Sequence, residues 1–203
     1  VTVLSMGPAS AEQVLRDAVA MGADQGVLLS HRQFAGADTL ATSYTLARAV
    51  AKLENVDLVI CGKQAVDGDT AQVGPGMAAK LNMPHITQVR KIRELTEDKL
   101  VAEKLTDRGY EVVEVPLPAV ITVVKELNEP RIPGLRGMMR AKKAEIPVWG
   151  PEDIEAEEDR IGLKGSPTQV WRTFEPERQR KGEMLEGTPS EQAADLWQRL
   201  KAL

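Results

Sequence analysis

The sequence has little of several residue types, and each scarcity excludes a class of protein. Its single cysteine, Cys61, cannot form an internal disulfide framework. Its two histidines, His31 and His85, lie far apart and lack the cysteine or carboxylate spacing of a metal site. No apolar run approaches the roughly 18 residues that a membrane span needs. We therefore expect no disulfide, no metal centre and no membrane helix.

Charge and length narrow the class further. The chain has 203 residues, of which 28% are charged, with a net charge of −4. An acidic balance argues against nucleic acid as the main ligand, because phosphate neutralisation needs a basic face. We expect a soluble, cytoplasmic protein with one domain and an extension. Because Val1 lies directly in an apolar strand, we also expect further residues to precede it.

The first 125 residues alternate short apolar runs with amphipathic helical stretches. Strands are expected at 1–5, 26–30, 56–61, 85–89 and 119–124, and helices at about 11–21, 39–53 and 76–81. We expect Ser10 to cap the first helix, Asp38 or Thr39 to cap the second, and Leu40 to face inward. Strand–helix–strand repeats at this spacing predict right-handed crossovers and a parallel sheet.

The middle and the end of the chain depart from this pattern. Residues 89–115 alternate apolar and polar side chains between turn signals, which predicts an antiparallel hairpin or meander beside the parallel sheet. Residues 136–143 read as a short basic helix. We place the α/β nucleotide-binding domain at 1–150. Residues 151–203 are expected to form an extended C-terminal arm that ends in a helix at 190–203.

The segment 62–75 is the strongest candidate for a binding site. A short apolar strand runs into a glycine-punctuated loop and then into a helix N-terminus, an arrangement that offers free backbone N–H groups to a phosphate. The loop lacks both the G-x-x-x-x-G-K-[ST] and the G-x-G-x-x-G pattern. A nucleotide site and a plain strand–helix turn therefore remain equally favoured by the residues alone. Elsewhere we find neither a nucleophile elbow nor paired acids, and hence no autonomous catalytic site.

Three separated motifs carry a family resemblance. Residues 58–74, then 127–131, then 139–143 resemble the beta subunit of electron transfer flavoprotein, with similarity over about residues 1–153. The resemblance implies a heterodimer with an alpha subunit that carries FAD, and an adenine nucleotide bound by this chain. It also implies about fifty residues before Val1. The cofactor-binding residues that it implies are Met6, Gly62, Lys63, Gln64, Ala65, Val66, Asp67, Gly68, Asp69, Thr70, Ala71, Gln72 and Val73.

The same resemblance implies a surface for recognising a redox partner. The loop after residues 128–131 is similar to the family's recognition loop, in which an exposed leucine anchors a partner such as an acyl-CoA dehydrogenase or a quinone reductase. The residues implied here are Leu135, Arg136, Met138, Met139 and Arg140. A single apolar plug beside a basic run suits an acidic partner with a pocket.

One departure from the family pattern bears on the nucleotide. Many members that hold AMP read D-D-x-N-Q-T-G in the loop, whereas this chain has Gly68 beside the acidic residues and Val73 in place of the threonine. This form resembles the electron-bifurcating subgroup, in which a second FAD accepts electrons from NADH and divides them between the alpha-subunit FAD and a low-potential acceptor, ferredoxin or flavodoxin. Two alternatives stay open: a non-bifurcating carrier with structural AMP, and a non-redox adenine-nucleotide-binding protein.

Overall fold

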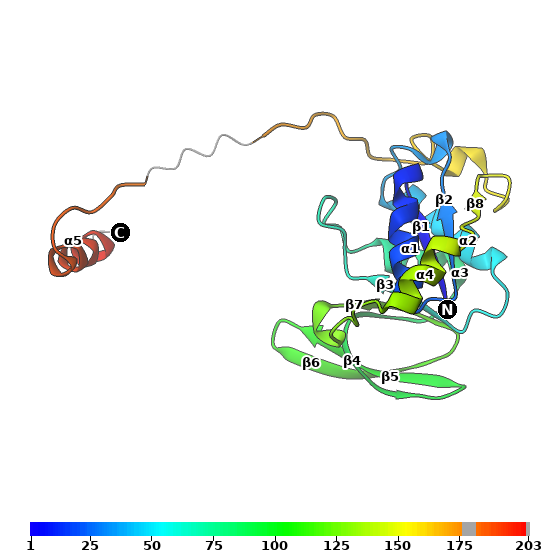
Figure 1. The fold of residues 1–203 in the computed structure, drawn as a ribbon, viewed down its shortest axis with the longest axis horizontal. Coiled ribbons are helices and arrows are strands. Elements are labelled where there is room, and N and C mark those ends of the chain that lie inside the picture. Colours follow the sequence, from blue (N-terminus) through cyan, green and yellow to red (C-terminus); the bar gives the residue numbers. More distant parts are fainter. Residues whose placement is uncertain (176–181, 202–203) are drawn as a thin grey trace. The chain divides into compact units, whose positions relative to one another are not determined.

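The computed structural model describes residues 1–175 and 182–201, which divide into two compact units, Val1–Gln169 and Val170–Leu203 (Figure 1). The sequence placed this division at 150. Residues 151–169 group with the first unit because Ile154 and Ile161 are buried in its core, at 2% and 1% exposure. The two isoleucines are isolated among acidic residues and prolines, so the sequence pattern does not predict their burial.

The first unit holds two sheets instead of the single sheet expected. The first is parallel, with strand order β1-β2-β8, and the second is mixed, with order β3-β7-β4-β5-β6. The strands are β1 (Thr2–Met6), β2 (Gln25–Leu29), β3 (Leu58–Gly62), β4 (His85–Leu95), β5 (Lys99–Thr106), β6 (Gly109–Pro116), β7 (Ala119–Val123) and β8 (Val148–Trp149). The expectation of a single sheet was wrong for the described residues, because β1 and β3 are terminal strands of separate sheets.

The mixed sheet confirms the predicted change of strand direction. Strand β7 pairs in parallel with β3 and β4, and four of its five residues are buried, as an interior parallel strand requires. Strands β4, β5 and β6 then pair antiparallel. Figure 1 shows these three strands at the end of the unit away from β2 and β8. Ile86 of β4, Leu100 of β5 and Ile121 of β7 belong to one hydrophobic cluster.

Helices cover the parallel strands in two pairs. Helix α1 (Glu12–Met21) packs beside α4 (Leu135–Lys143), and α2 (Thr39–Lys52) beside α3 (Val73–Leu81). Short 3-10 turns precede or join them at Ala9–Ala11, Arg32–Phe34, Lys125–Leu127 and Glu158–Arg160. In the second unit, α5 (Pro189–Lys201) is the predicted terminal helix; the last two residues of that prediction lie outside the described ones.

Of the two predicted helix caps, the one on α2 is confirmed and the one on α1 was wrong. Asp38 caps α2 as expected, since its carboxylate accepts the backbone N–H groups of Leu40 and Ala41. Ser10 does not cap α1: it lies inside a 3-10 turn, and the helix begins after Ala11 without a side-chain cap. Leu40 was expected to face inward but is 50% exposed, because the buried side of α2 in this turn is that of Ala41, which is 0% exposed.

Candidate functional site

The predicted loop lies where α/β proteins place their ligands. Strand β3 ends at Gly62, and the exposed residues 63–72 lead from its carboxyl end into α3. The backbone N–H of Lys63 donates to the carbonyl of Val123, at the carboxyl end of β7. Met6 occupies the corresponding end of β1 and packs against the cluster around Leu29. Carboxyl ends of parallel strands are the usual ligand edge of such sheets.

The N-terminus of α3 is suited to hold an anion. Gln72 precedes the helix without a side-chain cap, so the first backbone N–H groups, at Val73 and Gly74, are not occupied by a capping side chain. Pro75 in the first turn has no N–H to satisfy. The helix dipole adds partial positive charge at the same end. An anion placed at the start of α3 would therefore be stabilised.

Close packing fixes this helix end against the sheet. A Cβ built on Gly74 would lie 2.4 Å from Cγ2 of Thr122, and a Cβ on Gly76 would lie 2.8 Å from Oγ of Ser43. Glycine thus lets α3 approach both β7 and α2. Thr122 is itself fixed, because its hydroxyl accepts the backbone N–H of Gln88 at 2.9 Å.

The two acidic residues of the loop are occupied within it. Asp67 accepts the backbone N–H of Gly68 at 2.9 Å, and Asp69 accepts the side-chain amide of Gln64. Asp69 and Ala71 hold the left-handed backbone conformation, with φ of 51° and 55°. Non-glycine residues in that region cost of order 1–3 kcal/mol each and gather at ligand-binding loops. The carboxylates therefore shape the loop, which explains acidic residues beside a site for an anion.

The remaining loop glycines leave open space. A Cβ built on Gly62 or Gly68 would meet no atom within 4 Å. Val66, between them, is fully exposed. No protein atom within that distance opposes a ligand placed beside either glycine.

Cys61, the single cysteine, is half-buried. It lies near the end of β3, with its sulfur 4.0 Å from that of Met77 on α3. Burial raises the pKa of the thiol, which disfavours the reactive thiolate. The neighbouring Ile60 is 57% exposed, since β3 is a terminal strand whose outer surface is uncovered among the described residues.

The predicted recognition residues lie together on α4. Leu135, its first residue, is 71% exposed, and Met138 and Met139 are 46% and 55% exposed. Arg140 instead turns toward α1: its guanidinium donates to the carbonyls of Val19 at 2.6 Å and Ala23 at 3.1 Å. Arg140 thus anchors α4, and the methionines and Leu135 face outward.

A shallow cavity of about 360 Å³ lies between the end of α1 and the start of α4. Three arginines line it, Arg131, Arg136 and Arg140, together with Ile132 and Pro133. The recognition surface is therefore apolar at Leu135 and basic around it.

Two contacts of the loop were not anticipated from the sequence. The Thr39 hydroxyl donates to the Thr70 hydroxyl at 3.3 Å, which joins the start of α2 to the loop. A second cavity, of about 390 Å³, lies between the first turns of α2 and α3, with Lys80 at its edge. Desolvation, with a smaller effect of the Arg160 charge, lowers the pKa of Lys80. Only the tertiary fold places these residues, 31 or more positions apart, side by side.

The described residues offer neither a metal site nor a membrane-spanning helix. Within residues 1–175 and 182–201, no three His, Cys, Asp or Glu side chains form a group able to hold a metal ion. Among the helices described, none is long and apolar enough to cross a membrane.

Comparisons with known proteins place the chain in a family. A family described as "Electron transfer flavoprotein domain" matches residues 1–154. The electron transfer flavoprotein subunit beta of Thermoanaerobacterium thermosaccharolyticum is 47% identical over 203 residues, which are 100% of this chain and 77% of that protein.

Two relatives carry names that mention a CoA reductase. The caffeyl-CoA reductase-Etf complex subunit CarD of Acetobacterium woodii is 48% identical over 99% of this chain and 77% of its own. The acryloyl-CoA reductase electron transfer subunit gamma of Anaerotignum propionicum is 42% identical over 98% and 77%. With full-length similarity to beta subunits and a family match over three quarters of its length, the chain belongs to the electron transfer flavoprotein beta-subunit family.

Proposed function

We propose that this beta subunit binds a second FAD at residues 62–73 and serves an electron-bifurcating flavoprotein. The observation that carries the proposal is the uncapped N-terminus of α3, next to a loop with open space at Gly62 and Gly68. Backbone N–H groups at Val73 and Gly74 would hold the phosphates. When bound, an isoalloxazine ring supplies both two-electron and one-electron transfer, which no side chain of this protein can supply.

The residues present fit an adenine dinucleotide better than a single nucleotide. Val73, the first residue of α3, offers no hydroxyl to an AMP phosphate. Gly68 lies beside empty space that a second ring system can fill. The chain's own part is to bind the cofactor, to orient it through the loop and to keep the loop's acids, Asp67 and Asp69, paired away from its phosphates.

The donor, acceptor and partner chain follow from the same proposal. NADH would deliver electrons, and ferredoxin or flavodoxin would take those of low potential. Two relatives are named as parts of CoA reductase systems, which supports a CoA-linked dehydrogenase or reductase as the other acceptor. The alternatives are a non-bifurcating carrier with AMP at this site, and a non-redox nucleotide-binding protein.

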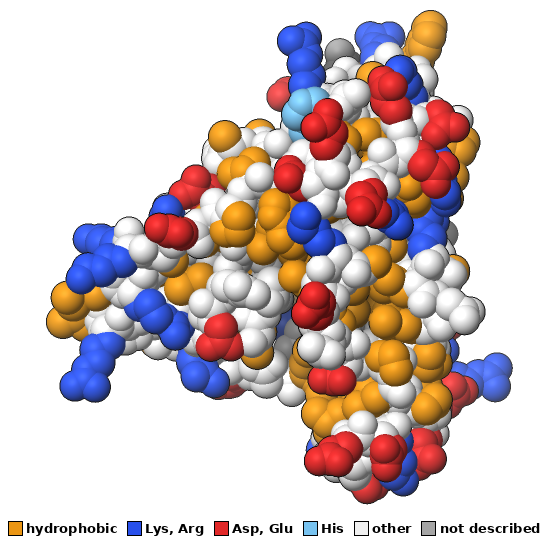
Figure 2. Space-filling view, turned by 90° about the vertical axis from the view of Figure 1, so that its right-hand side faces the viewer, with side chains coloured by type: hydrophobic (Ala, Val, Ile, Leu, Met, Phe, Trp, Pro, Cys, Tyr) orange, Lys and Arg blue, Asp and Glu red, His pale blue; other side chains and the backbone are white. Residues whose placement is uncertain are grey.

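The uncovered apolar surface supports an alpha subunit as a permanent partner. Trp171 and Phe174 on the arm are 97% and 74% exposed, and Leu196, Trp197 and Leu200 give α5 an exposed apolar stripe. Figure 2 shows hydrophobic side chains forming a band between acidic ones on one face of the molecule. Exposed apolar surface of this extent is typical of a face that another chain covers.

The stoichiometry of the purified heterodimer tests the proposal. Acid extraction and absorbance should give two FAD per heterodimer, with no AMP recovered. One FAD with one AMP would contradict bifurcation and favour the simple carrier. A heterodimer without any extractable nucleotide would contradict both and favour a scaffold.

A matched pair, Val73→Thr against Thr87→Val on β4, tests the role of the missing hydroxyl. Val73→Thr should raise the retained AMP fraction, and Thr87→Val should not.

We further propose that Leu135 anchors the redox partner. Leu135→Ala removes an exposed side chain that no part of the core uses, so stability and flavin content should not change. Loss of a central apolar anchor costs about 2 kcal/mol or more, which is roughly 30-fold in partner affinity. Leu95→Ala, at a similarly exposed leucine on β4, is the control. Equal partner kinetics for both variants would remove Leu135 from this role.

A further inference from the structure

One carboxylate holds both the start of α2 and the last residues before the arm. Oδ1 of Asp38 accepts the backbone N–H groups of Leu40 at 2.9 Å and Ala41 at 3.1 Å. Oδ2 of the same side chain accepts the backbone N–H of Thr168 at 3.1 Å and its hydroxyl at 2.9 Å. Thr168 stands two residues before the second unit begins at Val170. Asp38 therefore fixes the point where the arm leaves the first unit.

The backbone on either side of Thr168 is fastened to the same place. The N–H of Asp38 donates to Oγ of Ser166 at 2.8 Å, and the Ser166 hydroxyl donates to the carbonyl of Gly162 at 2.6 Å. Ser166 is only 9% exposed. The bond to Gly162 is buried and the bond from Asp38 is part-buried, so Ser166 is fixed two residues before Thr168.

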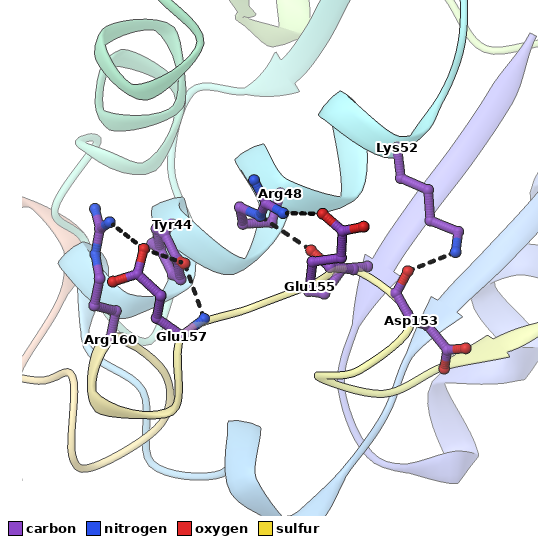
Figure 3. A network of polar contacts seen from close by, with 8 residues as sticks. Tyr44, Arg48, Lys52, Asp153, Glu155, Glu157 and Arg160 are labelled. Carbon is purple, nitrogen blue, oxygen red and sulfur yellow. Dashed lines mark hydrogen bonds and ion pairs between the residues drawn. The ribbon is translucent and has the colours of Figure 1, made fainter.

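Helix α2 holds the preceding turns as well (Figure 3). Arg48 donates to the carbonyl of Ile154 at 3.0 Å and pairs with Glu155 at 3.1 Å. The Tyr44 hydroxyl accepts the backbone N–H of Glu157 at 3.0 Å. The segment 153–168 therefore lies along α2 from its last turn to its first, and the arm exit is the part attached at the start of the helix.

The residue next to Asp38 contacts the cofactor loop. Thr39 donates to Thr70, and Thr70 stands between Asp69 and Ala71, the two loop residues in left-handed conformation. A ligand that orders this loop fixes Thr70, and Thr70 fixes Thr39 at the first turn of α2. The loop contacts Thr39 and the arm exit contacts the adjacent Asp38, so the two segments are linked through α2 and need not touch each other.

We propose that Asp38 and Thr39 couple nucleotide binding at residues 62–73 to the attachment of the arm exit at Thr168. A bound adenine nucleotide favours the state in which Thr168 is hydrogen-bonded to Asp38. By thermodynamic reciprocity, that state favours nucleotide binding by the same factor. The inference rests on the proposed nucleotide site. The neutral hydrogen bond between Thr39 and Thr70 limits the coupling, so a factor of about three to ten is expected.

Hydrogen exchange at the Thr168 amide tests the coupling directly, because that N–H donates to Asp38 from the arm exit. The purified heterodimer, stripped of nucleotide, is compared with and without saturating AMP, which shares the adenosine phosphate of both candidate cofactors. AMP should slow exchange at Thr168 by about three- to tenfold. In Thr39→Val, AMP should still bind, but the slowing should disappear.

The reverse direction supplies the second readout. Thr168→Val removes the hydroxyl bond to Asp38 and leaves the backbone bond in place, so it should weaken AMP binding by up to the factor by which AMP slows exchange. Thr188→Val is the matched control, since Thr188 makes the same pair of bonds to Glu191 in the second unit, both at 2.8 Å. It should leave AMP affinity unchanged.

The outcomes separate the two proposals. AMP that binds with unchanged exchange at Thr168 overturns the coupling and leaves the nucleotide site standing. A heterodimer that binds neither AMP nor FAD overturns both. Equal effects of Thr168→Val and Thr188→Val on AMP affinity would show a general loss of stability, and would likewise overturn the coupling.

Discussion

Replacing Gly74 by alanine should misplace the helix that starts the cofactor site. The added Cβ would stand 2.4 Å from Cγ2 of Thr122 and 3.6 Å from Cβ of Cys61. Thr122 is 3% exposed and cannot turn away without giving up its bond to the Gln88 N–H. Helix α3 must therefore shift away from β7, which moves its first N–H groups.

Two opposing effects set the size of the change. Alanine is favoured over glycine inside a helix by about 1 kcal/mol. Overpacking a rigid site costs about 1–3 kcal/mol, and a clash with a fixed methyl group belongs at the upper end. We expect Gly74→Ala to lower the free energy of unfolding by about 1–2 kcal/mol, the difference between these effects.

A second substitution isolates the clash. Thr122→Ser deletes the methyl group but keeps the hydroxyl that Gln88 needs, and should alone cost about 1 kcal/mol for the lost buried methyl. In Gly74→Ala/Thr122→Ser the new methyl takes the place of the old one. The double variant should therefore be more stable than Gly74→Ala, with a coupling of about 2 kcal/mol between the sites.

Urea unfolding of the four proteins, followed by circular dichroism at 222 nm, measures this cycle. AMP affinity is measured alongside: Gly74→Ala should weaken it, and the double variant should recover it. Additive costs within about 0.5 kcal/mol would refute the close approach of α3 to β7 as the fixing contact. Recovered stability without recovered AMP affinity would refute the link between that contact and the site.

Three further predictions concern the surrounding frame. Glu103 is 5% exposed and pairs with two arginines, so Glu103→Gln should lower the free energy of unfolding by urea by about 1–3 kcal/mol. Glu114→Gln, at an exposed pair, should lower it by less than about 0.5 kcal/mol. Equal losses for the two variants would contradict the burial argument. Gly137→Ala, whose Cβ would lie 2.2 Å from the Ala20 carbonyl, should loosen α4 and speed its hydrogen exchange; unchanged exchange would refute that contact. Burial raises the pKa of Asp38, but four hydrogen bonds outweigh it and hold the pKa below its ordinary value, so the bonds between Asp38 and Thr168 should persist at neutral pH and be lost only as pH falls below about 4. Hydrogen exchange at the Thr168 amide, corrected for the intrinsic effect of pH, should then become faster, and an unchanged corrected rate would contradict this prediction.

Local signals in the sequence were enough for the alternating part of the fold. Asp38 before an apolar-periodic run predicted the cap of α2, and the predicted helix over about 11–21 ends where α1 does, before Gly22 with its φ of 127°. The apolar run 119–124 predicted an interior strand, and β7 is one. These features depend on side chains within a few residues of one another, which is why a linear reading finds them.

Features set by distant contacts could not be read in this way. Ser10 and Gln13 match a capping box, yet packing of the preceding 3-10 turn moves the start of α1 past Ser10. Strand β8 has only two residues, and its pairing with β2 depends on the path of the chain after α4. The contact of Thr39 with Thr70 joins two exposed loops and leaves no pattern in the sequence.

The candidate site shows the same division between local and distant causes. Residues 62–73 could be located because glycines after a buried strand and before a helix are a local signal. Their ability to bind depends on the placement of α3, and that placement depends on Gly74 against Thr122 and on Gly76 against Ser43. The loop itself is exposed and held mainly by its own hydrogen bonds and by Thr39. A loop with so few attachments is ordered by its ligand more than by the core. One of those attachments leads to Thr39, and the neighbouring Asp38 holds Thr168, so the proposed coupling extends the order that a nucleotide brings to the loop as far as Thr168.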